Sequence, residues 1–295
     1  MIFVLKDLDV NRSTLASDLY SLYHDMFLKD LEGESYVSPK QLLLTLYSEC
    51  KSVMNIAEQN DIQEFISVFL DKLNMCTKQE MPKPVYVGEV DAHTVFQNRM
   101  SKSWYDHHKN EYSLLTCVIY SQVITQVSCG QCNSLHHNYE VHMNYMLPII
   151  CGSLQGCFDA YFSDEAVCDQ WKCDKCNQVG TESMKATKLL KVPNILILTL
   201  KRFDESMRKI NTIVEVPRRL DVSKHCLMAS QPPRYMLRSV AFHQGSSLLG
   251  GHYYSACMDG DAMYIIDDET VSETANHNLG RGYMFFYEVV SPPRS

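Results

Sequence analysis

The sequence predicts an α+β fold in which a helical N-terminal part precedes a largely antiparallel sheet. From about Ser13 to Met75, apolar residues recur three or four positions apart, as they do on a buried helix face. From Tyr112 onward, the segments are rich in β-branched and aromatic residues and are separated by Gly, Asp or Asn. The chain has 295 residues, 45% of them hydrophobic, which is enough to bury one large core or two small ones.

Three helices are predicted in the N-terminal part, with the sequences STLASDLYSLYHDMFLKDL, SPKQLLLTLYSEC and DIQEFISVFLDKLNM. Ser13 and Ser38 are predicted N-caps, and Pro39 suits a first helical position. The next stretch, TKQEMPKPVYVGEV, contains two prolines and is expected to be a connector.

Strands are predicted for most of the rest of the chain, in the segments LLTCVIYSQVITQVSC, NILILTLKRF, YMLRSVAFHQG, GGHYYSACM, AMYIID and YMFFYEVV. We find no internal repeat and no low-complexity tract in the sequence. A single helix-then-sheet arrangement is therefore expected.

The net charge of -8 disfavours a general nucleic-acid surface. No membrane span is expected either, because the apolar start MIFVL is interrupted at once by Lys6, Asp7 and Asp9. We expect an intracellular protein, cytoplasmic or nuclear, that binds neither nucleic acid nor membranes.

Two CxxC pairs predict a metal site formed by Cys129, Cys132, Cys173 and Cys176. Each pair can direct two thiolates at one ion, and two pairs complete a tetrahedral zinc site of the structural kind. Four unrelated core thiols are the alternative. A redox role is disfavoured because neither pair opens a helix after a strand. The long insert between the pairs predicts that each pair lies at the tip of its own hairpin. His136, His137 and His142 lie in that insert and are interpreted as solvated strand residues.

His252 and the aspartates Asp267 and Asp268 are candidates for an acid–base pair. A hairpin with DGDA at its tip would bring the start of GGHYYSACM to the end of AMYIID. A carboxylate there would fix the tautomer of the imidazole and stabilise its charged form. Gly250 and Gly251 would let backbone or substrate approach closely. An ordinary hairpin with a histidine at its end is the alternative.

Several ordered segments resemble the ubiquitin-specific protease family, over roughly residues 15 to 290. The resemblance is carried by EQNDIQEFI, VPNILILTLKRF, KINTIVEVPRRLDV, YMLRSVAFHQGSSLLGGHYYSAC, YIIDDETVS and GYMFFYEV, and by the two CxxC pairs. It implies a papain-like fold with a helical thumb, a β-rich palm and zinc-bearing β fingers. Residues 1–290 would form one such domain, incomplete at its N-terminus, with the thumb remainder in 1–80, the fingers mainly in 112–190 and the palm in 191–290.

The resemblance also implies a function and site residues. The family cleaves bonds after the last glycine of the ubiquitin tail with a Cys-His-Asp/Asn triad. His252 would be the base, Asp267 its orienting acid and Asp268 an auxiliary polar residue. Asp61 resembles the acid that meets an arginine of the ubiquitin tail, although it is equally a plausible helix N-cap.

The Gly-Asn-Thr-Cys-type box that carries the nucleophile in the family has no counterpart in this sequence. Buried structural thiols are the expected fate of the cysteines that we considered in its place, which are Cys50, Cys76, Cys117, Cys226 and Cys257. The chain as written is therefore expected to be inactive. Either the true start lies upstream of Met1, or this is a pseudo-protease that binds ubiquitin as a scaffold. A zinc-ribbon nucleic-acid binder is disfavoured because no basic stripe accompanies the CxxC pairs.

Overall fold

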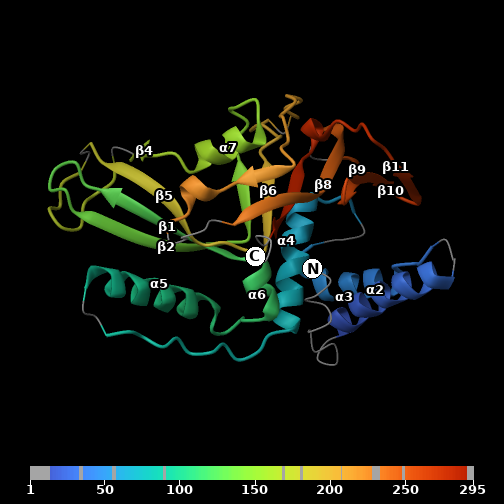
Figure 1. Cartoon of the computed structure of the whole chain (residues 1–295), viewed down its shortest axis with the longest axis horizontal. Coiled ribbons are helices and arrows are strands. Elements are labelled where there is room, and N and C mark those ends of the chain that lie inside the picture. The colour runs from blue at the N-terminus through green and yellow to red at the C-terminus, as the bar shows by residue number, and fades with distance from the viewer. Residues whose placement is uncertain are drawn as a thin grey trace.

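Two sheets and the helices around them form the protein (Figure 1). A computed structural model describes residues 14–32, 36–54, 58–88, 91–167, 170–179, 182–206, 208–227, 233–247 and 250–290. The predicted N-cap Ser13 lies outside these residues. Within these residues, five α-helices precede the first strand and one further α-helix lies among the strands, which agrees with the predicted α+β class.

The larger sheet has eight strands in the order β11-β10-β9-β8-β12-β6-β3, with β7 paired to β8. Neighbouring strands are antiparallel except for β3 and β6, which are parallel. Its strands are β3 (Asn144–Leu147), β6 (Ile195–Leu200), β7 (Arg219–Asp221), β8 (Arg234–Ser247), β9 (Gly250–Asp259), β10 (Ala262–Asp267), β11 (Thr270–Glu273) and β12 (Met284–Val290).

The smaller sheet extends away from the larger one and has the order β2-β1-β5-β4 (Figure 1). Its strands are β1 (Ser121–Ser128), β2 (Leu135–His142), β4 (Glu165–Ala166) and β5 (Met184–Lys191). All its neighbours are antiparallel, and β1 forms long ladders with both β2 and β5.

Helices lie around the two sheets, and some of them pack on each face of the larger one. They are α2 (Thr14–Glu32), α3 (Lys40–Cys50), α4 (Ile62–Cys76), α5 (Ala92–His108), α6 (Leu114–Ile119) and α7 (Leu154–Tyr161), with short 3₁₀ turns η2 (Ser223–His225) and η3 (Leu279–Arg281). None of the helices within the described ranges is long and apolar enough to cross a membrane.

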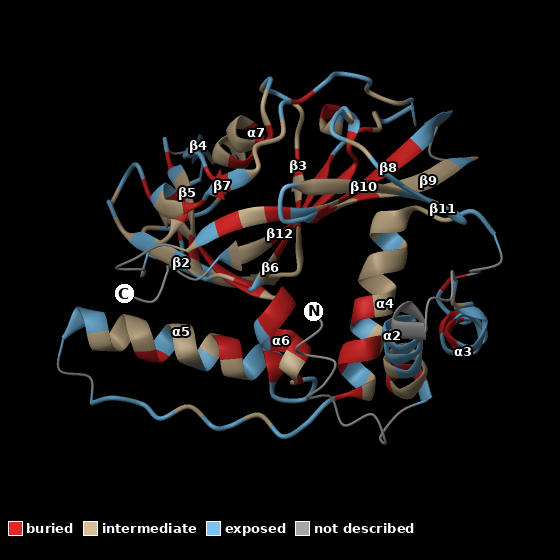
Figure 2. Ribbon diagram, turned by 45° about the vertical axis from the view of Figure 1, so that its right-hand side comes forward, coloured by how far each residue is buried: buried red, intermediate tan, exposed pale blue. Residues whose placement is uncertain are grey.

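Alternation along the central strands divides the core in two. On β6, Leu196 and Leu198 point to a cluster that contains Phe158 of α7, whereas Ile197 points to a cluster that contains Leu73 of α4. A strand that is buried on both faces needs a nearly continuous apolar run, and ILILTL is one in which only Thr199 is polar, with its hydroxyl donating to the Asn144 side chain at 3.1 Å. Figure 2 shows α4 standing between this sheet and α2, with its buried residues toward the end near α6.

The start of the first predicted strand is wrong, because residues 114–119 form the helix α6. Ser113 and Thr116 make a capping box, in which the Ser113 hydroxyl accepts from the Leu115 amide at 3.0 Å and the Thr116 hydroxyl accepts from the Ser113 amide at 3.0 Å. The helix ends at Ile119, and β1 begins only at Ser121. The mainly apolar segment LLTCVI therefore forms a helix of about two turns, because the capping box and the burial of its side chains outweigh its strand propensity.

The helices α5 and α7 were not predicted. Asp91 caps α5 through a box with Thr94, and Ser153 caps α7 by accepting from the Gly156 amide at 3.0 Å. The predicted cap Ser38 accepts from the Lys40 amide at 3.4 Å, and α3 begins at Lys40, just after Pro39. That predicted helix start is thus displaced by one residue.

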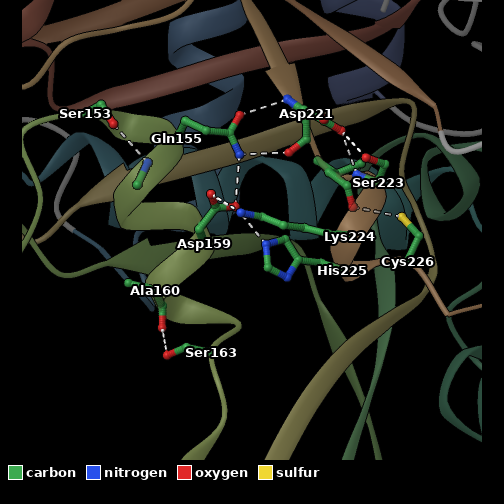
Figure 3. Close-up of polar contacts among 12 residues, drawn as sticks. Ser153, Gln155, Asp159, Ala160, Ser163, Asp221, Ser223, Lys224, His225 and Cys226 are labelled. Carbon is green, nitrogen blue, oxygen red and sulfur yellow. Dashed lines mark hydrogen bonds and ion pairs between the residues drawn. The ribbon is translucent and has the colours of Figure 1, made fainter.

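A polar network fixes α7 to the loop after β7 (Figure 3). The carboxylate of Asp159 accepts from Lys224 at 2.5 Å and from Nε2 of buried His225 at 2.8 Å. Gln155 bonds both the carbonyl and the amide of Asp221, at 2.8 and 2.9 Å. This network holds α7 in place on the face of the larger sheet opposite to α4.

Candidate functional site

His252 and Asp267 meet at one end of the β9–β10 hairpin. The strands pair from Asp259 with Ala262 to Ser255 with Ile266, and Gly260 at the tip has φ of 57°. Nε2 of His252 lies 2.5 Å from Oδ1 of Asp267, so the ring donates to the carboxylate. Among the described residues, Nδ1 of the ring has no hydrogen-bond partner. This leaves Nδ1 available to take a proton from a reacting group.

The charge of the imidazole is favoured by its surroundings. The hydrogen bond to Asp267 raises the pKa of His252, and the negative charges of Asp267 and Asp268 act in the same direction. Asp268 is exposed and occupies the tight turn into β11 with φ of 51°. Ligand atoms of the three residues lie within 4.8 Å of one another. The structure thus brings the three predicted residues together, with Asp267 in direct contact and Asp268 beside it.

Gly250 and Gly251 lie where three segments approach closely. The side-chain amide of Gln59 accepts from the Gly251 amide at 3.2 Å and donates to its carbonyl at 3.3 Å. A Cβ on Gly251 would come within 2.2 Å of Nε2 of His243 and 2.6 Å of the Gln244 carbonyl oxygen. Only glycine fits this approach of β9 to β8.

Asp61 serves as the N-cap of α4 and also reaches the larger sheet. Its Oδ1 accepts from the amides of Gln63 and Glu64 at 2.8 and 3.3 Å. Its Oδ2 accepts from the hydroxyls of Tyr253 at 3.4 Å and Tyr283 at 2.8 Å. Burial, reinforced by the charge of Asp61, raises the pKa of Tyr253 to about 12 and raises the pKa of Tyr283 as well. The carboxylate therefore joins α4 to the sheet at the same place as Gln59.

A cavity of about 240 Å³ lies between the loop before α4 and the start of β9. It is lined by Glu58, Gln59, Asn60, His243, Gly250, Gly251 and Tyr253. Each of these residues is a glycine or carries a polar side-chain group, so the lining offers hydrogen-bond partners to a bound segment.

No thiol of the described residues forms a hydrogen bond with His252. Cys50 is 2% exposed within the cluster of α2 and α3, and burial raises its pKa. Burial raises the pKa of Cys226 to about 11. Cys257 lies 3.7 Å from the Ser239 hydroxyl, and exposed Cys117 lies 3.7 Å from the Tyr112 hydroxyl. Cys168 is outside the described residues.

The four cysteines of the CxxC pairs come together at the far end of the smaller sheet. Their sulfur atoms all lie within 4.8 Å of one another. One pair occupies the β1–β2 turn, and the other lies in a turn closed by the bridge between Lys172 and Val179. The predicted pair of hairpin tips is therefore observed.

Both CxxC turns have the same backbone. In the first, the Cys129 amide donates to the Ser134 carbonyl and the Asn133 amide donates to the Cys129 carbonyl. In the second, the Cys173 amide donates to the Gln178 carbonyl and the Asn177 amide donates to the Cys173 carbonyl. Asn133 and Asn177 have φ of 53° and 59°, a conformation that asparagine tolerates better than most residues. The cluster thus offers four thiolates, a set that could hold a metal ion and that zinc prefers.

The interpretation of His136 as a solvated strand residue is wrong. Its Nε2 lies 3.2 Å from Sγ of Cys173, and its ring packs edge-on against Trp171. His142 instead contacts the Glu140 carboxylate at 3.2 Å, and His137 is exposed on β2. Period-two alternation could not reveal the contact of His136 because its partner is 37 residues away.

Sequence reasoning missed Gln59, His243, Tyr253 and Tyr283, which line the cavity or hold Asp61. Gln59 lies in the segment EQNDIQEF and Tyr253 directly follows His252, so both could have been predicted as site residues from their position beside Asp61 and His252. Tyr283 is 222 residues from its partner Asp61, and only the fold reveals that contact.

The sequence is similar to known proteins along most of its length. The family described as Ubiquitin carboxyl-terminal hydrolase matches residues 4–287. The chain is 29% identical over 265 residues to ubiquitin carboxyl-terminal hydrolase 5 of Saccharomyces cerevisiae, covering 78% of this chain and 32% of that protein. It is 25% identical over 267 residues to ubiquitin carboxyl-terminal hydrolase 21 of Bos taurus, covering 80% and 47%. The chain therefore spans less than half the length of these two relatives.

Solved structures share the fold. The SAGA DUB module of Ubp8, Sgf11, Sus1 and Sgf73 bound to monoubiquitin aligns with a TM-score of 0.69 and 18% identity, covering 95% of this chain and 59% of that chain. A second SAGA Ubp8 DUB module aligns with a TM-score of 0.72 and 19% identity, covering 98% and 63%. The mixed helix-and-sheet architecture described above is thus a known fold.

Proposed function

The chain belongs to the ubiquitin carboxyl-terminal hydrolase family, the ubiquitin-specific proteases, and we therefore propose that it binds the C-terminal tail of ubiquitin. In this proposal, His252 is the base of a thiol protease centre and Asp267 its orienting acid. The observation that carries it is the 2.5 Å contact between them, which leaves Nδ1 of the ring for a thiol. The helices up to residue 80 would be the thumb, residues 112–190 mainly the fingers, and residues 191–290 the palm.

The tail would lie in the cavity between the loop before α4 and the start of β9. Gly250, Gly251 and Tyr253 line that cavity, and the Tyr253 hydroxyl donates to Asp61, whose carboxylate would supply a negative charge for a basic residue of the tail. Two tyrosine hydroxyls already donate to the carboxylate of Asp61 and hold it in place. An arginine of the tail could therefore bind it without the entropic cost of immobilising that side chain.

Hydrolysis needs a thiolate beside His252, and the described residues provide none. We propose that these residues bind ubiquitin without cutting its conjugates on their own. A ubiquitin-binding pseudo-protease is the second candidate function, and this same lack of a neighbouring thiol favours it.

Two measurements on the 295-residue chain test the proposal. Calorimetric titration with ubiquitin should show binding, and ubiquitin without its last two glycines should bind at least about tenfold more weakly because the tail contacts are lost. A ubiquitin that carries a thiol-reactive group at its C-terminus should not label the chain. Absence of ubiquitin binding would refute the tail site, whereas labelling at any cysteine would refute the claim that no nucleophile is present.

We also propose that the four-cysteine cluster binds a structural zinc ion, which would pin the tips of the two hairpins. Removal of one ligand by Cys173→Ser should abolish stoichiometric zinc, measured by plasma emission spectroscopy, and lower the melting temperature. The exposed Cys117→Ser variant is the matched control and should keep both values. Equal zinc content in the two variants would contradict the assignment.

A further inference from the structure

A second and larger cavity, of about 460 Å³, adjoins the candidate site on the larger sheet. His243 and Asp267 are part of its lining, so it borders both the tail cavity and the His252–Asp267 pair. Three further lining residues are basic: Arg202 after β6, Lys209 in the following loop, and Arg281 in η3.

Among the described residues, no carboxylate forms a salt bridge with Arg202, Lys209 or Arg281. Asp267 is the acid in the cavity lining, and it is engaged by His252. The neighbouring Arg208, in contrast, pairs with Asp204 at 3.1 Å outside the cavity. Among the described lining residues, positive charge therefore exceeds negative charge.

The side chain of Arg202 is held rigidly in the wall of this cavity. It is 1% exposed, and its guanidinium donates to the carbonyls of Gly282, Ile210, Thr212 and Gly280 at 2.6 to 3.1 Å. A guanidinium has five N–H groups, so one N–H of Nη2 is left over. Four neutral acceptors hold the cation in place without cancelling its charge.

The positive charges of Arg202, Lys209 and Arg281 also repel one another. Burial lowers the pKa of Arg202 to about 10, and Arg281 contributes to this. Burial likewise lowers the pKa of Lys209, with added repulsion from Arg202 and Arg281. Lys209 donates to the carbonyl of His243, which fixes its ammonium group at the cavity wall. An anion among these groups would relieve their repulsion.

We propose that this cavity is an anion-binding site that takes one carboxylate or phosphate group. Two sources have this chemistry. One is the terminal carboxylate of a ubiquitin tail lying in the adjoining cavity, and this source rests on the proposed function. The other is a free oxyanion, which does not depend on that function.

Inorganic phosphate tests the site itself. Calorimetric titration in a chloride buffer of matched ionic strength should show binding, and Lys209→Gln and Arg281→Gln should each weaken it about tenfold because a charged partner is lost. Arg208→Gln removes the same charge one residue away and should leave phosphate binding unchanged. The site would be overturned as one for free oxyanions if phosphate did not bind, or if it bound equally to the unsubstituted chain and to all three variants.

Ubiquitin distinguishes the two sources. Ubiquitin with a free terminal carboxylate should bind more tightly than ubiquitin amidated at its C-terminus, and Lys209→Gln should remove the difference. Equal binding of both forms, together with phosphate binding, identifies a free oxyanion as the ligand. Equal binding without phosphate binding overturns the inference while leaving the ubiquitin site intact. If neither form binds, the proposed function fails and the phosphate titration alone decides the inference.

Discussion

At the residue scale, the candidate site depends on a few contacts between backbone and side chain. Gln59 holds Gly251 by both its amide and its carbonyl, and the ring of His243 fills the space that a side chain on Gly251 would need. His252 directly follows, so its position is fixed by the strand as well as by Asp267. The imidazole is thus oriented before any substrate arrives, which is the condition for efficient proton transfer.

The ionisation of His252 gives the first residue-scale prediction. Asp267→Asn should lower the pKa of His252, because it removes the hydrogen bond that chiefly raises it. Asp268→Asn should lower it less, since that carboxylate acts only through its charge. Titration of the imidazole by NMR measures both shifts, and a larger effect of Asp268→Asn would contradict the assignment of Asp267 as the orienting acid.

The sign of the linked stability follows from the raised pKa. A histidine whose pKa is higher in the folded state stabilises the protein fully below its unfolded pKa of about 6.5. That contribution is lost as the pH rises through the folded value. Asp267→Asn should therefore flatten the stability profile above about pH 6.5.

At the element scale, one carboxylate both starts a helix and attaches it. Asp61 caps α4 with Oδ1 and receives Tyr253 and Tyr283 with Oδ2. A cap satisfies amides that a helix terminus leaves without partners. The two tyrosine contacts connect α4 directly to residues 192 and 222 positions later, of which Tyr253 lies on β9 and Tyr283 directly precedes β12.

Substitution of Asp61 separates these two roles. Asp61→Ala should lower the free energy of unfolding by roughly 2 to 4 kcal/mol, because the cap and the tyrosine hydrogen bonds are both lost. Asp61→Ser retains a capping oxygen but not the reach to the tyrosines, so its loss should be about 1 to 2 kcal/mol. Urea unfolding measures both, and equal losses would show that the tyrosine contacts contribute nothing.

At the scale of the whole molecule, buried neutral histidines join the layers. His108 at the end of α5 is 3% exposed and packs against Trp104 and Tyr120, with ring centroids 4.2 and 5.3 Å away. Lys191 of β5 lies over the Trp104 ring at 4.6 Å. Burial lowers the pKa of His108 to about 4, with added repulsion from His107 and Lys191. Burial also lowers the pKa of His225 and His243, and partial desolvation lowers the pKa of the more exposed His137 and His277.

Acid should therefore destabilise the folded protein. A lowered histidine pKa means that the unfolded chain binds a proton first, so stability is present above pH 6.5 and falls as the pH decreases toward 4. For His108 alone the loss over this range amounts to about 3 kcal/mol. Urea unfolding between pH 7 and pH 4.5 should show a smaller loss in His108→Phe than in the exposed control His107→Gln. Equal slopes for the two variants would contradict a buried neutral His108.

Local sequence signals predicted much of the fold where the pattern was strong. Alternation and β-branched residues marked β6, β8, β9, β10 and β12, and apolar spacing marked α2, α3 and α4. They failed for α5, which has few apolar residues and is held by its cap and by packing against the smaller sheet. They failed for α6 because LLTCVI, in which only Thr116 is polar, fits a strand as well as a short helix.

The sequence by itself determined the α+β class, the two CxxC turns and the pairing of His252 with Asp267, because each depends on residues that are close along the chain. Tertiary structure alone decided the partners of Asp61, the contact of His136 with Cys173 and the cavity of unbalanced cations. The reason is physical: these features join side chains between 37 and 222 residues apart, or depend on which charges the fold leaves without a counterion.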